Sequence, residues 1–120
     1  MRPALALAAS ALALAGCGGP GTHSDVVPGG SPKRGHDLIV YYGCGACHVI
    51  GGVGRANGHV GPPLTHFSAK DTIAGKLANT PAQVERWIAN PQKVVPGNDM
   101  PVLGVHADQL PDIVAYLYTQ

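Results

Sequence analysis

The pentapeptide Cys44-Gly45-Ala46-Cys47-His48 constrains this chain more than any other feature of the sequence. Two cysteines three positions apart, followed at once by a histidine, form the C-x-x-C-H pattern that is typical of covalent attachment of a c-type haem. Both thiols fall on one side of a helical turn, where they can add to the two vinyl groups of one porphyrin. The imidazole can then take the proximal position on the iron. The pattern predicts one covalent haem c, held by Cys44 and Cys47 and ligated by His48.

Two other kinds of site use a C-x-x-C pair. A thioredoxin-like dithiol would need a βαβ pattern around it, which this sequence lacks. A zinc site would need further cysteines or well-spaced histidines. We therefore expect haem rather than a redox dithiol or zinc.

Residues 1–16 are predicted to be a secretory signal, because Arg2 is followed by an Ala/Leu run too short to span a bilayer. The run ends in Leu14-Ala15-Gly16-Cys17, which resembles the lipobox of bacterial lipoproteins. That resemblance implies cleavage before Cys17 and lipidation of its thiol. It also accounts for the third cysteine of an exported chain. The alternative is an ordinary signal peptide cleaved nearby, which would leave Cys17 free.

The rest of the chain divides by composition into two parts. Residues 17–32 are rich in Gly and Pro and nearly uncharged, so they are predicted to form a flexible tether. Residues 33–120 are predicted to form one small domain, whose marginal core a buried porphyrin would enlarge. Eight Lys and Arg are balanced by seven Asp and Glu, so no basic face indicates a nucleic-acid partner.

Three helices are predicted, each from a start signal followed by apolar residues at helical spacing. The first begins at Ser31-Pro32, with serine as the cap, and runs into Gly43. The second begins with a capping box from Thr80 to Gln83 and ends at Asn90-Pro91. The third begins near Asp108, which leaves its proline in the first turn. The predicted fold class is all-α.

Two further segments resemble parts of a class I cytochrome c. The first is Gly61-Pro62-Pro63-Leu64, which follows the haem motif. The resemblance implies a small all-α fold whose helices and loops wrap around one covalent haem. It also implies that the carbonyl of Pro62 accepts a hydrogen bond from His48, with Leu64 in the same haem-binding segment. Trp87, the only tryptophan, is expected in the haem pocket.

The second segment is the loop from Pro96 to Pro101, which matches the family's distal-ligand loop residue for residue. The resemblance implies that Met100 is the second iron ligand, and a thioether ligand raises the reduction potential relative to a second histidine. Three histidines could compete for this position, and we expect them to be surface or hydrogen-bonding groups instead: His59, His66 and His106.

The resemblance is nearest to the cytochrome c domain fused to subunit II of some bacterial haem–copper oxidases, on residues 62–66 and 87–92. It implies a one-electron carrier rather than an enzyme. Its redox partners would be respiratory complexes, a haem–copper oxidase among them, and a lipid anchor would hold it at the outer face of the cell membrane or in the periplasm. Two alternatives stay open: a dedicated cytochrome subunit of a dehydrogenase, and a haem enzyme or gas sensor. The latter needs an open distal position, against which Met100 argues.

Overall fold

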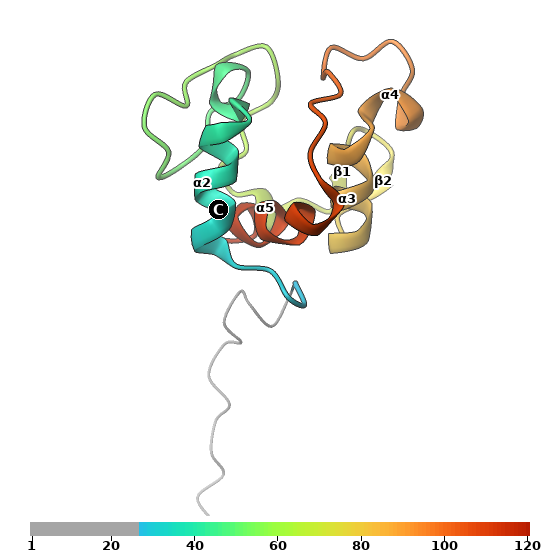
Figure 1. Cartoon of the computed structure of the whole chain (residues 1–120). Coiled ribbons are helices and arrows are strands. Elements are labelled where there is room, and N and C mark those ends of the chain that lie inside the picture. The colour runs from blue at the N-terminus through green and yellow to red at the C-terminus, as the bar shows by residue number, and fades with distance from the viewer. Residues whose placement is uncertain (1–26) are drawn as a thin grey trace, which may run out of the picture.

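The computed structural model describes residues 27–120, which form a helical domain with one short hairpin (Figure 1). Strand β1 (Thr72–Ile73) pairs antiparallel with β2 (Leu77–Ala78). Single 3₁₀ turns lie at Cys44–Ala46, Phe67–Ala69 and Ala107–Gln109. The helices are α2 (Pro32–Tyr41), α3 (Pro81–Ala89), α4 (Pro91–Val94) and α5 (Leu110–Leu117). This architecture confirms the predicted small all-α fold class.

Helices α2 and α5 cross at close range, and one glycine of α2 makes this possible. A β-carbon on Gly35 would collide with the backbone of Asp112 and lie 2.9 Å from Cβ of Tyr116. Glycine at this position therefore lets the two helices touch, which offsets its low helix propensity. Ile39 of α2 and Val114 of α5 are buried in the resulting core.

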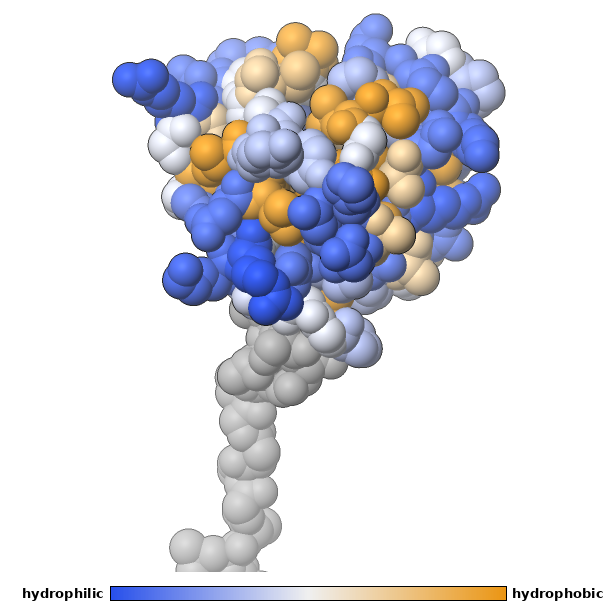
Figure 2. Space-filling view, viewed as in Figure 1, coloured by the Kyte–Doolittle hydropathy of each residue, from blue (hydrophilic) through white to orange (hydrophobic). Residues whose placement is uncertain are grey.

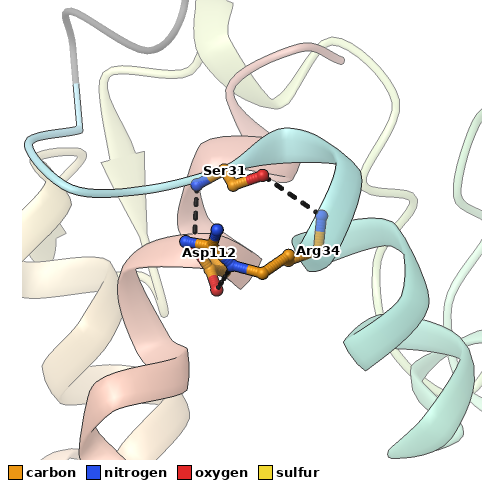
Figure 3. Close-up of polar contacts among 3 residues, drawn as sticks. All are labelled: Ser31, Arg34 and Asp112. Carbon is orange, nitrogen blue, oxygen red and sulfur yellow. Dashed lines mark hydrogen bonds and ion pairs between the residues drawn. The ribbon is translucent and has the colours of Figure 1, made fainter.

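An ion pair fixes the start of α2 against α5 (Figure 3). Asp112 accepts hydrogen bonds from Nε of Arg34 at 2.7 Å and from the backbone N–H of Ser31 at 2.7 Å. Ser31 also caps α2, since its Oγ accepts from the backbone N–H of Arg34 at 3.4 Å. The hydrogen bond from Arg34 holds the pKa of the Asp112 carboxyl below its usual value.

The packed domain begins earlier than the sequence predicts. Val27 is only 1% exposed and belongs to the core, and its carbonyl accepts a hydrogen bond from Gly30 N at 3.0 Å. Residues 27–32, assigned above to the tether, are therefore part of the folded structure. Composition suggested a tether because glycine and proline dominate this stretch, yet its small residues fit against Pro111 and Ala115 of α5. The predicted signal segment, Cys17 and residues 17–26 of the tether lie outside the described residues.

Helix starts differ from the predictions in two places. Thr80 occupies the cap position of α3, but its side chain makes no capping hydrogen bond, so the predicted capping box is wrong. Pro81 alone favours the start there. The last helix is preceded by a 3₁₀ turn at Ala107–Gln109 and only then continues as α5. Within residues 27–120, no helix is long and apolar enough to cross a membrane.

Two arms rise from the α2–α5 base (Figure 1). One carries the C-terminal end of α2 and residues 43–61, and the other carries α3, α4 and residues 95–105. In the same view, hydrophobic residues gather at the surface of the upper part of the domain, and the lower part is mainly hydrophilic (Figure 2). A cavity lies between the arms, with Ile113 and Leu117 of α5 in its lining.

Candidate functional site

The cavity between the arms has a volume of about 510 Å³, within the usual range of about 300–1,000 Å³ for a small-molecule or cofactor site. Its lining is mostly apolar and comes from α2, α3, α5, the β1–β2 hairpin and the loops between them. It brings together all seven residues that the sequence analysis assigns to cofactor binding: Cys44, Cys47, His48, Pro62, Leu64, Trp87 and Met100.

A sharp turn after α2 presents the two thiols to the cavity. Gly43 has a φ of 70°, a left-handed conformation that ends the helix. The next residues form one 3₁₀ turn, in which Cys47 N and His48 N donate to the carbonyl of Cys44 at 3.2 and 3.1 Å. Both thiols are free, and burial raises the pKa of the Cys44 thiol. One turn of backbone thus carries both thiols and the imidazole to the same cavity.

The imidazole of His48 is held by the loop that follows it. Its Nδ1 lies 2.7 Å from the carbonyl oxygen of Pro62. A carbonyl can only accept, so Nδ1 carries a proton, and in the neutral imidazole the lone pair is on Nε2. Gly61 N donates to the carbonyl of Cys47 at 2.8 Å, and a β-carbon on Gly61 would collide with the imidazole ring. This is the Pro62 contact that the family resemblance implies.

Met100 reaches the cavity from the opposite arm. The short helix α4, which the sequence did not predict, lies between α3 and the segment that carries Met100. The backbone N–H of Met100 donates to Oδ1 of Asn98 at 2.7 Å, and its carbonyl accepts from Nε2 of Gln92 at 2.9 Å. The sequence analysis missed Gln92. Its place in the 87–92 stretch was the only available signal.

Trp87 and Leu64 are half-buried and pack against the core on the cavity wall. The β1–β2 hairpin, which no apolar periodicity predicted, also contributes to the lining through Ile73 and the turn residues Ala74 and Gly75. Each strand has two residues, too few for an alternating pattern to be visible. The turn itself is tight, since Ala74 and Gly75 both have positive φ.

The other histidines of the described chain do not line the cavity. The three candidate competitors for the iron are exposed: His59, His66 and His106. His36 on α2 is half-buried, and its ring packs edge-on against Tyr116, with centroids 5.5 Å apart. Among the histidine and methionine side chains of the described residues, Met100 is therefore the one that lines the cavity from the arm opposite His48.

The residues present fit a haem c. Covalent attachment needs two thiols beside one another, and the iron needs axial donors such as imidazole nitrogen and thioether sulfur. The cavity supplies these donor types, with the Nδ1 of His48 bound to Pro62 and both cysteines unpaired. Its apolar walls suit the hydrocarbon faces of a porphyrin, whose burial contributes favourably in proportion to the area removed from water.

Comparison with known proteins gives one consistent result. The cytochrome c family model matches residues 32–120. The chain is 34% identical over 86 residues to cytochrome c oxidase subunit 2 of Alkalihalophilus pseudofirmus, covering 71% of this chain and 24% of that subunit. It is 32% identical over 88 residues to cytochrome c2 of Agrobacterium tumefaciens, covering 62% of this chain and 79% of that protein. No solved structure gives a significant match.

The chain thus spans about a quarter of the oxidase subunit and most of the length of cytochrome c2. The family match covers most of the sequence and includes the two thiols, the histidine and the methionine of the cavity. This protein belongs to the cytochrome c family, as a small class I member with an electron-transfer role, and its cofactor is a covalently bound haem c.

Proposed function

We propose that this protein is a membrane-tethered one-electron carrier with a His/Met-ligated haem, which passes electrons to a respiratory complex. One observation carries the proposal: His48 and Met100 line a single cavity from opposite arms, with both thiols beside the histidine. Filled axial positions on both sides favour electron transfer over binding of a substrate or gas. The bound haem supplies the chemistry, a one-electron change between Fe(III) and Fe(II).

The chain's own residues would hold and shield the cofactor. Cys44 and Cys47 would form the two thioether bonds, Nε2 of His48 and the sulfur of Met100 would bind the iron, and Pro62 orients the imidazole. Leu64, Trp87 and the buried side chains Ile113 and Leu117 exclude water from the cavity. A low local dielectric disfavours the more highly charged ferric state and so supports a raised potential.

The proposed lipid tether and the proposed electron acceptor are supported by different observations. Cys17 follows the lipobox-like residues 14–16, and lipid chains there would hold the domain at a membrane surface outside the cytoplasm. The similarity to an oxidase subunit favours a haem–copper oxidase as the electron acceptor. A carrier tethered beside its acceptor benefits from a raised effective concentration.

Spectroscopy of the holoprotein tests the ligation. The ferric wild type should show the weak far-red band of a sulfur–iron bond and should resist carbon monoxide when reduced. Met100→Ala should lose the band, bind carbon monoxide and have a lower potential, because a thioether stabilises Fe(II). Val102→Ala is the control, since Val102 is 50% exposed in the same loop and does not line the cavity. A wild type that lacks the band and binds carbon monoxide readily would support the enzyme-or-sensor alternative.

Fractionation of the full chain tests the tether. Wild-type protein should sediment with membranes and carry an acylated Cys17 as its first residue by mass spectrometry. Cys17→Ser should release the protein into the soluble exported fraction with its haem content unchanged. An unmodified wild-type chain in the soluble fraction would rule out the lipid anchor and leave the carrier function intact.

A further inference from the structure

A single side chain, Gln92, holds the loop that carries Met100. Its Nε2 donates to the backbone carbonyls of Asn98 at 2.8 Å and of Met100 at 2.9 Å. Its Oε1 accepts from the backbone N–H of Gly97 at 3.0 Å. A glutamine amide has two N–H donors and one carbonyl oxygen, so all three groups are engaged within one loop.

Gln92 can act as a fixed point because its own helix is anchored. It lies on α4, where Asn90 caps the turn by accepting from Lys93 N at 3.0 Å. Its neighbours Pro91 and Val94 are buried in the protein interior. The position of the Gln92 amide is therefore set by the core, whereas the loop that it binds is otherwise exposed at Pro96, Gly97 and Asp99.

A second amide completes the arrangement at Met100. Oδ1 of Asn98 accepts from Met100 N at 2.7 Å, and Nδ2 of Asn98 donates to the carbonyl of Val95 at 2.6 Å. Gln92 in turn binds the carbonyl of Asn98. Both backbone polar groups of Met100 are thus bound by side-chain amides, one of them directly anchored on α4.

We propose that Gln92 is a positioning residue for Met100, whose amide keeps the thioether in place for the sixth coordination position of the iron. This inference rests on the proposed His/Met ligation. A thioether is a weak ligand. The fraction of molecules in which it binds the iron therefore depends on the conformational entropy that its loop loses on binding, and a loop that is already held in place loses less. Groups that orient a metal ligand without touching the metal commonly change metal affinity by about 10–100-fold when replaced.

Two variants test the inference, with imidazole as the competing ligand for the ferric holoprotein. Gln92→Ala removes all three hydrogen bonds. Gln92→Glu keeps the size of the side chain, but its carboxylate has no N–H and faces the carbonyls of Asn98 and Met100. In both variants the apparent affinity for imidazole should rise by about 10–100-fold. The far-red band should weaken and the potential should fall. Either variant suffices if the other does not fold.

Gln83→Ala is the matched control. Gln83 is also half-buried and helical, but its Oε1 accepts a hydrogen bond only from the exposed Arg86 at 3.5 Å. It should keep wild-type imidazole affinity and potential. If the wild type has the far-red band and the Gln92 variants keep wild-type imidazole affinity and potential, this inference is overturned alone, even if their unfolding free energy falls. If the wild type lacks the band, Met100 ligation and this inference both fail.

Discussion

His48 donates a hydrogen bond from Nδ1 to the carbonyl oxygen of Pro62 at 2.7 Å, and this bond fixes which ring nitrogen is free. Gly61, the residue before Pro62, lies so close to the same ring that a β-carbon would overlap it. The loop therefore both orients the imidazole and encloses it. Only Nε2 is left with a lone pair for a metal.

Gly61→Ala should displace the imidazole. The added methyl group must push the His48 ring or the loop away, at a cost of about 1–3 kcal/mol in the unfolding free energy. The holoprotein should show a changed Soret spectrum and tighter binding of external ligands on the proximal side. Gly54→Ala in the same loop is the control, because a β-carbon there meets nothing within 4 Å. Equal stability and identical spectra for the two variants would contradict the close packing seen at Gly61.

Replacing the cavity cysteines should change how the haem is held. Cys44→Ala or Cys47→Ala should leave at most one thioether and sharply lower the yield of holoprotein. The double variant should release all of its haem on extraction with acidified acetone. Cys17→Ala serves as the control, since this third cysteine is predicted to carry lipid rather than haem. Full covalent haem in the double variant would refute the attachment site.

The Arg34–Asp112 pair should make stability depend on acid pH. The pKa of Asp112 is held below its usual 3.8, chiefly by the hydrogen bond from Arg34. The ionised carboxylate thus stabilises the fold fully above pH 3.8, and this contribution is lost as the pH falls through the lower folded-state pKa. Asp112→Asn should lower the Tm by several degrees at neutral pH. The difference from wild type should shrink only below pH 3.8. A constant difference down to pH 2 would contradict this role.

The sequence predicted the cavity residues well where the information is local. The turn Cys44–His48 carries its own chemistry, whereas the role of Pro62 was expected from the family resemblance. Met100 could be placed only through the family resemblance, because periodicity says nothing about which loops meet. Gln92 escaped prediction since its role exists only when α4 and the Met100 loop fold back on each other.

The packing of Val27 and the missing cap at Thr80 show a second limit of prediction from sequence. Composition marks a Gly/Pro-rich stretch as a linker, but a single apolar residue can fix it when small neighbours allow close approach to α5. A capping sequence offers a hydrogen bond that tertiary structure need not use, and Pro81 fixes the start of α3 without it. The packing of residues 27–30 depends on contacts with α5, a distant part of the chain.

The apolar rim of the cavity should make electron transfer to the acceptor largely insensitive to salt. Val60 is 66% exposed and Leu103 is 36% exposed, and both line the cavity from opposite arms. Val102, next to Leu103 in the chain, is 50% exposed, and the whole chain is close to neutral, with a formal net charge of +1. Exposed apolar patches of this kind mark contact surfaces, and without strong charges there is little long-range steering for salt to screen.

This salt dependence can be measured by stopped-flow oxidation of the reduced protein by oxidase-containing membranes, at low and at high ionic strength. The wild-type rate should change little with salt, whereas Val60→Glu should slow the reaction several-fold by placing a charge that must be desolvated at the contact. Val40→Glu is the matched control, because Val40 is 55% exposed on α2 and does not line the cavity. A steep fall of the wild-type rate with salt, or equal slowing by both variants, would place the docking surface elsewhere on the domain.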